Sequence, residues 1–192
     1  MENYLFLDTE TTGFKRSGAL VQPKQARVCQ IAMILTDNEG GILAEMSHLI
    51  KPEGWIISDG AYDCHGISQQ ECEMYGLPSQ VMMNMYYEMA YKAQTIVAHN
   101  SNFDKGMMDI EMAHSGERPV QKPWYCTQEN SKEICCIPPT DKMKAAGRYH
   151  YKTPSLAEAL KHFTGEDIEG AHDAMVDTRA CKDVFFAMRR KS

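Results

Sequence analysis

The order of short apolar runs along the chain constrains its fold more than any other feature. The runs lie at Tyr4–Leu7, Val28–Thr36, Ile42–Ile50, Thr95–Ala98 and Trp124–Cys126. Residues 37–41, Asp-Asn-Glu-Gly-Gly, suit a turn that joins the second and third runs into an antiparallel hairpin. Helical segments separate the later runs. The pattern therefore predicts an α/β fold, in which a mixed sheet carries helices on both faces.

The helices are expected to begin at recognisable capping residues. Ser68 with Glu71, and Ser155 with Glu158, have the spacing of a capping box, and Thr127 is placed to cap another helix. The remaining helices are expected from Pro78-Ser79 toward Lys92, from Asn102 to about His114, and from about Asp173 to Arg190. No repeat or linker interrupts this series, so we expect residues 1–192 to form a single domain.

Composition excludes several classes of protein. A chain of 192 residues with 43% hydrophobic content can bury a sizeable core. No segment approaches the roughly 20 apolar residues that span a bilayer, and the acidic start is unlike a signal peptide. We therefore expect a cytoplasmic protein without a membrane partner. A net charge of −6 argues against non-specific coating of long nucleic acids but not against binding of one strand end.

The seven cysteines are odd in number and form no C-x-x-C pair, which favours reduced thiols in a cytosol-like compartment. A zinc site made by Cys64, His65 and Cys72 is a weaker alternative, because a second ligand pair at the usual spacing is missing.

Four carboxylates lie where a charge is costly. Asp8 and Glu10 end the first apolar run, two residues apart, so both point to one face of a strand. Asp104 follows the fourth run, and Asp177 interrupts an apolar helix face. Each alone could be an ordinary strand end or helix terminus. Together they indicate a site for two divalent cations, which would compensate the charges and can cleave phosphodiesters.

His172 is the candidate general base beside these carboxylates. On one continuous helix, His172 and Asp177 would point about 140° apart and could not share a substrate. Asp173 is a good N-cap residue, so we expect the last helix to start there, with His172 in the preceding loop. From that loop, the imidazole could reach the side of the helix that carries Asp177.

These motifs resemble those of the DEDDh exonucleases, a superfamily that includes the proofreading subunit of bacterial replicative DNA polymerase, ribonuclease T and oligoribonuclease. The matching segments are Phe6–Gly13, Gln30–Ala32, His65–Ser68, Val97–Asp104 and His172–Ala180. Those between the first and last motifs are most similar to the proofreading branch. The tyrosine subfamily has Tyr four residues before the last Asp. Here that position is Asp173, and His172 stands in the histidine-type place.

The resemblance implies a ribonuclease-H-like fold with five strands in the order 3-2-1-4-5. It also implies a 3′–5′ exonuclease that releases nucleoside 5′-monophosphates from single strands with two Mg²⁺ or Mn²⁺ ions. Asp8 would bridge both ions, Glu10 and Asp177 would complete one site, and Asp104 would hold the other. His172 would accept the proton of the attacking water.

Substrate contacts are expected from two groups of residues. The resemblance implies positions in or beside the matched motifs: Thr9, Thr11, Phe14, His99, Asn100 and Phe103. The basic segments Phe14–Arg27 and Thr140–Lys152 are the second group, and their candidates are Lys15, Arg16, Arg148 and Lys152. Basic residues mixed with aromatics suit single strands. Solvated loops are the alternative reading of both segments.

Three functions stay open at this point. The first is a stand-alone exonuclease acting on DNA 3′ ends, and the second is an RNA-trimming enzyme on the same scaffold. The third is a nucleic-acid-binding module without activity, which the complete carboxylate set disfavours. Proofreading subunits continue into a tail that tethers the polymerase, and nothing follows Ser192 here. The sequence does not indicate an oligomeric state.

Overall fold

A computed structural model describes residues 2–191. Its five-stranded sheet has the order β3-β2-β1-β4-β5. The strands are β1 (Tyr4–Thr11), β2 (Val28–Thr36), β3 (Ile42–Leu49), β4 (Thr95–Ala98) and β5 (Trp124–Cys126). The first three strands pair antiparallel, whereas β4 runs parallel to both β1 and β5. The expected mixed sheet and its strand order are confirmed.

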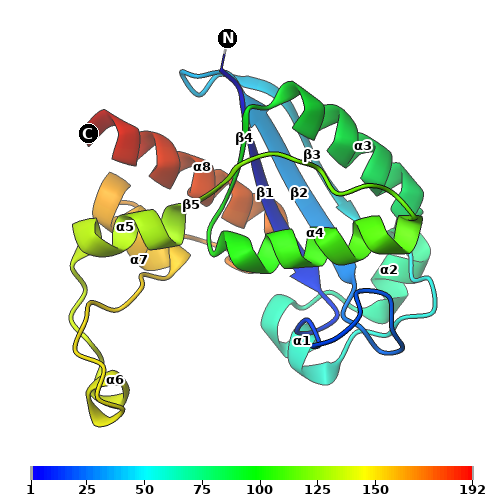
Figure 1. The fold of residues 1–192 in the computed structure, drawn as a ribbon, viewed down its shortest axis with the longest axis horizontal. Helices are drawn as coiled ribbons and strands as arrows, with labels where there is room; N and C mark the ends of the chain where they lie inside the picture. The colour runs from blue at the N-terminus through cyan, green and yellow to red at the C-terminus, as the bar shows by residue number, and fades with distance from the viewer. Residues whose placement is uncertain (1, 192) are drawn as a thin grey trace.

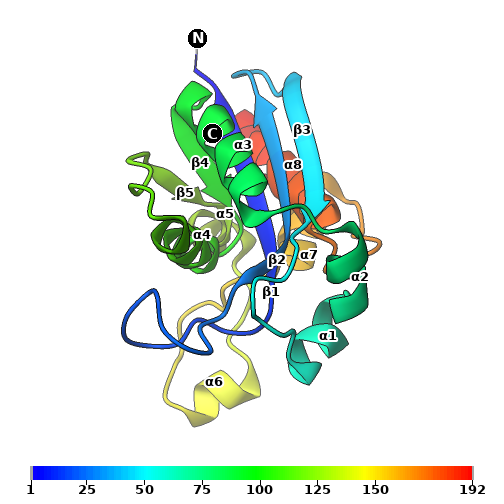
Figure 2. The same cartoon turned by 90° about the vertical axis from the view of Figure 1, so that its right-hand side faces the viewer.

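Helices cover both faces of the sheet, as expected (Figures 1 and 2). Leu5 and Leu7 belong to the core cluster that includes residues of α3 (Ser79–Lys92) and α4 (Ser101–Ser115). On the other face, Phe6 packs against Phe185 of α8 (Ala174–Lys191). Each of these buried side chains contributes about 1.5–3 kcal/mol to folding.

The remaining helices connect these layers. They are α1 (Asp59–His65), α2 (Gln69–Tyr75), α5 (Thr127–Cys135), α6 (Asp141–Ala145) and α7 (Leu156–Thr164). Both predicted capping boxes form, at the starts of α2 and α7. Within residues 2–191, no helix is long and apolar enough to cross a bilayer.

Two helices were not predicted. Helix α1 buries none of its residues, and neither does α6, so neither has the apolar periodicity that reveals a helix in a sequence. Helix α6 lies inside the basic segment Thr140–Lys152, where no helix was expected. Ser58 and Thr140 cap the two helices with their side-chain oxygens.

The prediction that Thr127 caps α5 was wrong. Cys126 occupies the N-cap position, and its sulfur accepts a weak bond from the Glu129 N–H at 3.5 Å. Thr127 is fully buried instead, with its hydroxyl 3.0 Å from His99 Nδ1. The hydroxyl is thus used to join α5 to the end of β4.

Candidate active site

Strand β1 is longer than its apolar run, and this extension carries the first two carboxylates. Pairing with β2 continues to Thr11, opposite Val28. Asp8 and Glu10 are therefore strand residues, two positions apart, and lie on the face that α8 covers. After Thr11 the chain turns out at Gly13, whose φ of 150° lies outside the range that side chains favour.

The parallel pairing of β1 with β4 brings Asp104 to the same end of the sheet. Helix α4 begins three residues after β4, and Asp104 lies in its first turn, 2% exposed. Its Oδ1 accepts two hydrogen bonds from Thr9, one from the backbone N–H at 3.1 Å and one from the hydroxyl at 2.9 Å. Thr9 therefore orients Asp104. Since Oδ1 is occupied, Oδ2 is the oxygen left for a ligand.

Asp177 and His172 come together as the sequence predicted. Asp173 caps α8, with its Oδ1 accepting from the N–H groups of Met175 and Val176 at 3.0 and 3.1 Å. His172 precedes the cap with a φ of 69°, and its own N–H donates to Asp177 Oδ2 at 3.2 Å. One potential ligand atom from each of Glu10, His172 and Asp177 lies within 4.8 Å of the others.

Gln30 is a supporting residue whose role was missed. Its Oε1 accepts from the Ala174 N–H at 3.1 Å, and its Nε2 donates to Asp173 Oδ2 at 3.3 Å. These bonds fix the start of α8 against β2, and with it Asp177. The signal was present in the sequence, because Gln30 is a polar residue within a strand that is otherwise almost entirely apolar.

The four carboxylates of this site have no lysine or arginine partner among the described residues. No lysine or arginine in the described part of the chain forms an ion pair with Asp8, Glu10, Asp104 or Asp177. Burial, followed by repulsion from the neighbouring carboxylates, raises the pKa of Glu10 to about 8. Burial likewise raises the pKa of Asp104 to about 7, against the hydrogen bonds from Thr9. The pKa values of Asp8 and Asp177 are raised for the same first reason.

One buried oxygen of the site lacks any partner. Asp177 Oδ1 is inaccessible to solvent, and no hydrogen-bond donor reaches it within residues 2–191. An unpaired buried carboxylate oxygen is expensive unless a ligand completes it. Oxygen donors of this kind suit hard divalent cations such as Mg²⁺ and Mn²⁺. The residues present therefore fit the cation site that the sequence implied.

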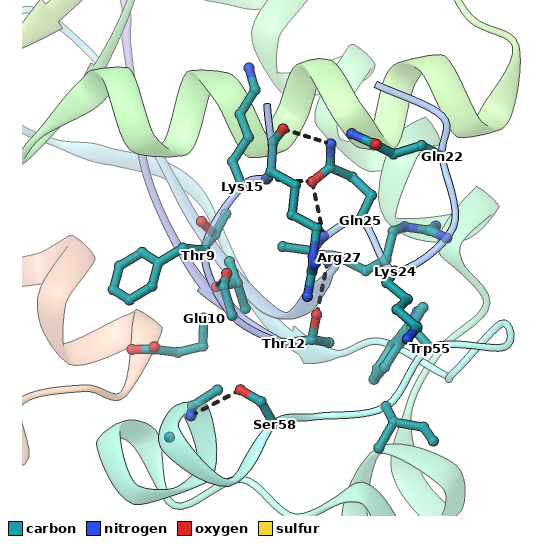
Figure 3. A pocket seen from close by; sticks show the side chains of 18 of the residues that line it. Thr9, Glu10, Thr12, Lys15, Gln22, Lys24, Gln25, Arg27, Trp55 and Ser58 are labelled. Atoms are coloured by element: carbon teal, nitrogen blue, oxygen red, sulfur yellow. Dashed lines mark hydrogen bonds between the residues drawn. The ribbon is translucent and has the colours of Figure 1, made fainter. Parts of the chain in front are cut away.

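A cleft of about 1130 Å³ extends from Thr9 and Glu10 along the loop that follows β1 (Figure 3). Phe14 and Phe103 line it, and their rings meet nearly edge-on with centroids 6.4 Å apart. Phe14 is 87% exposed, although it is a large aromatic side chain. Its ring is thus available for stacking by a planar group that enters the cleft beside the carboxylates.

The two basic segments differ from the expectation in which cations they offer. Lys15 and Arg16 line the cleft, and Lys15 extends over α4 in Figure 3. Arg27, which ends the first basic segment, is buried and bonded to Glu111 at 2.9 and 2.8 Å. Lys152 forms an ion pair with Glu158 of the α7 capping box. Only part of the predicted positive charge is therefore free for a ligand.

Of the other candidate residues, some are bonded within the protein and some are exposed. Both ring nitrogens of His99 are engaged, by Thr127 and by the Pro154 carbonyl at 3.2 Å, and burial lowers its pKa to about 4. The Thr11 hydroxyl donates to the Gly13 carbonyl at 2.8 Å. Asn100, in contrast, stands at the start of α4 without a side-chain capping bond, and its amide is exposed.

The alternative zinc site does not form. Cys72 is buried against the Cys29 carbonyl, whereas Cys64 is exposed, with its sulfur 3.8 Å from His172 Nδ1. His65 instead fixes the end of β1, since its Nε2 lies 3.2 Å from the Thr11 carbonyl while Nδ1 accepts from the Ile67 N–H. Sequence spacing suggested this cluster, but the ligands diverge in space.

The chain is similar to known exonucleases in sequence and in fold. The exonuclease family model RNase_T matches residues 5–185. DNA polymerase III subunit epsilon from Treponema pallidum (strain Nichols) is 25% identical over 181 residues, covering 94% of this chain and 74% of that protein. Among solved structures, the zinc-bound complex of E. coli ExoI with single-stranded DNA has a TM-score of 0.78 at 19% identity. E. coli exonuclease I in complex with a dA16 oligonucleotide has a TM-score of 0.77 at 20% identity.

The extent of these likenesses differs. Each of the two structures covers 100% of this chain, but the chain spans only 41% and 42% of theirs, less than half the length of exonuclease I. At such identities the structural likeness shows the fold alone. The family match rests on the sequence itself, and it covers all five residues of the carboxylate and histidine site.

Proposed function

The chain belongs to the RNase T family of exonucleases, of the DEDDh 3′–5′ type, and we propose that it removes nucleotides from single-stranded DNA. Hydrolysis would release nucleoside 5′-monophosphates. The observation that carries the mechanism is the buried Oδ1 of Asp177, which has no hydrogen-bond partner within residues 2–191. It belongs to a site whose four carboxylates form no ion pair with a described lysine or arginine. A structural cluster of acids would have acquired arginine or lysine partners, as Glu111 has.

We assign the metal ligands by their positions. Asp8, Glu10 and Asp177 would hold one divalent cation on the α8 face of β1, and Asp8 with Oδ2 of Asp104 would hold the second. When bound, such cations lower the pKa of a coordinated water and stabilise charge on the leaving oxygen. Thr9 keeps Asp104, and the His172 N–H keeps Asp177, in the orientation that this binding requires.

His172 would take the proton of the attacking water. Its Nδ1 faces the sulfur of Cys64, which leaves Nε2 as the accepting atom. The loop position before the α8 cap holds the ring beside Glu10 and Asp177 without making it part of the helix. A base in this position is expected to contribute on the order of 10² to 10⁴ to the rate.

Phe14, Phe103 and the amide of Asn100 would position the terminal nucleotide, with Lys15 and Arg16 near its phosphates. DNA is favoured over RNA because one relative is a subunit of a DNA polymerase and a structural neighbour was solved with single-stranded DNA. Replacing Lys15 and Arg16 by alanine should flatten the salt dependence of log affinity by roughly 1.4 if both contact phosphates.

Digestion of matched, 5′-labelled DNA and RNA oligonucleotides with Mg²⁺ or Mn²⁺ tests the proposal. We expect a ladder of products shortened from the 3′ end, faster on DNA, and no reaction in EDTA. Asp177→Ala should abolish the ladder, and His172→Ala should slow it about 10²-fold or more. Full activity in EDTA or in Asp177→Ala would contradict the assignment, and faster digestion of RNA would contradict the substrate.

A further inference from the structure

The segment 138–151, here called the arm, leaves the body between α5 and α7 and carries α6 at its tip (Figure 1). None of its residues is buried. Excursions of this length without a core of their own are usually either functional or linker segments. No residue of the arm belongs to the hydrophobic core, so core packing does not account for it.

The base of the arm is nevertheless fixed. Its two ends are joined by the Lys152 N–H, which donates to the Ile137 carbonyl at 2.9 Å. The ion pair between Lys152 and Glu158 ties this junction to α7. On the following turn, His99 donates from Nε2 to the Pro154 carbonyl. Because His99 directly follows β4, the arm is attached at the carboxyl end of the strand that neighbours β1.

The tip also has a defined conformation. Thr140 caps α6 through a bond from the Met143 N–H at 3.2 Å, and the Arg148 N–H donates to the Met143 carbonyl at 2.9 Å. Gly147 supplies the left-handed turn between them, with a φ of 71°. The arm thus has an ordered backbone, and its side chains lie on the surface of the protein.

The arm carries basic and aromatic side chains. Three basic residues and one acidic residue give the arm a net charge of +2, whereas the rest of the chain carries −8. Lys144 pairs with Asp141, but neither Lys142 nor Arg148 forms an ion pair within the described residues. Tyr149, next to Arg148, is 75% exposed. A cation beside an exposed aromatic ring suits a single strand, which offers phosphates and base faces together.

The arm projects from the same end of the sheet as the active site. In Figure 2 α6 and the loop with Lys15 and Arg16 project beyond the same end of the sheet, which is the end that carries Asp8 and Glu10. Figure 1 places them on opposite sides of the end of β1. A strand whose 3′ end lies in the active site must leave over this end of the molecule.

We propose that the arm binds the substrate strand upstream of the hydrolysed nucleotide, with Tyr149 stacked on a base and Arg148 on a phosphate. The inference rests on the proposed exonuclease function and adds a length requirement to it. A dinucleotide reaches the metal site but not the arm. A longer strand contacts both and is held through successive cleavages.

The variant Arg148→Ala/Tyr149→Ala tests this. Turnover is measured on a dT 20-mer and on the dinucleotide pdTpdT, and binding of a labelled dT 20-mer is measured in Ca²⁺. We expect kcat/KM on the 20-mer to fall about tenfold more than on the dinucleotide, since one stacked base is lost. The salt slope of 20-mer binding should flatten by about 0.7 for one lost phosphate contact.

The matched control is Tyr91→Ala/Lys92→Ala, which also removes one exposed tyrosine and one positive charge. Lys92 lies at the opposite end of β1, where its carbonyl accepts from the Asn3 side chain at 3.2 Å. This variant should keep the 20-mer preference. Equal losses on the two substrates, or a loss on the 20-mer no larger than in the control, would overturn the role of the arm.

The measurement of 20-mer binding separates this inference from the proposed function. A wild-type protein that digests neither substrate, but whose 20-mer binding weakens in Arg148→Ala/Tyr149→Ala, would refute the exonuclease and support the arm. An active enzyme with unchanged length preference and unchanged 20-mer binding in the variant would refute the arm and leave the exonuclease standing.

Discussion

Two carboxylates on α4 lie two turns apart, and the protein treats them in opposite ways. Asp104 and Glu111 are each 2% exposed. Glu111 accepts two bonds from the Arg27 guanidinium and a third from the Val28 N–H at 2.9 Å. Asp104 accepts from the hydroxyl and N–H of Thr9, but it forms no ion pair with a lysine or arginine of the described residues. Buried charge that is fully compensated supports the fold, whereas buried charge left without a cation marks a place for a ligand.

The largest difference between the two should appear in stability. Glu111→Ala leaves the Arg27 guanidinium buried without its partner, so we expect a loss of about 3–5 kcal/mol in the free energy of unfolding. Asp104→Ala relieves repulsion among the carboxylates and should cost far less. Denaturant unfolding in EDTA measures both. If Arg27→Met/Glu111→Leu recovers most of the loss, desolvation of an unpaired charge is its cause; no recovery would point to packing instead.

A second test uses pH, because only one of these regions should make stability depend on it. The raised pKa values of Glu10, about 8, and Asp104, about 7, mean that the folded protein keeps protons that the unfolded chain has lost above about pH 4.5. Without metal, stability should therefore fall as pH rises from about 5 to 8, by up to about 1.4 kcal/mol per pH unit for each group.

Melting temperatures in EDTA and in Mn²⁺ across that range check the sign. Bound Mn²⁺ should remove most of the decline, and Asp104→Asn should reduce it in EDTA. A melting temperature in EDTA that does not fall between pH 5 and 8 would show that the carboxylates are already compensated inside the protein.

The comparison also separates what the sequence could predict from what it could not. Local signals were read correctly at both capping boxes and at the Asp173 cap, which depend on neighbours within a few residues. The end of the first strand was misplaced, because β1 continues four residues past its apolar run, to Thr11. Asp8, Glu10 and Asp104 were found because they end or follow apolar runs, and Asp177 because it interrupts an apolar helix face. His172 was found in the loop before that helix. Their assembly and the strand order came from resemblance to a family, since no local rule joins residues about 100 positions apart.

What failed depends on distant partners. The basic segment Phe14–Arg27 has less free charge than its composition suggests, because Arg27 pairs with Glu111, 84 positions away, a partner that its sequence neighbourhood does not reveal. Thr127 was taken for a cap because its role, contact with His99, comes from a parallel strand. Helix α6 had no apolar face to reveal it. Tertiary packing decides which charges of the basic segments are free of ion pairs within the protein.

A smaller effect is expected where the protein orients Asp104 rather than binds a ligand directly. Thr9→Val removes the hydroxyl bond to Oδ1 and should lower activity or metal affinity about 10- to 100-fold. Thr9→Ser restores the hydroxyl and should recover most of it. Thr36→Val is the matched control: Thr36 is fully buried in β2, and its hydroxyl has no hydrogen-bond partner among the described residues. Equal effects of the two valine variants would indicate a packing role for Thr9.

The smallest effect is expected at Cys64, whose sulfur lies 3.8 Å from His172 Nδ1 in an exposed position. A thiol is a weak partner, and water can replace it there, so Cys64→Val should change turnover by no more than about twofold. The contrast is with Asp177, which receives the His172 N–H and keeps its place through Gln30 and the α8 cap. Steady-state kinetics of Cys64→Val across pH 6–9 shows whether the Cys64 thiol or the backbone bond to Asp177 orients the imidazole of His172. A tenfold loss in Cys64→Val with a displaced pH profile would mean that the thiol, and not the backbone around Asp177, sets the orientation of the imidazole.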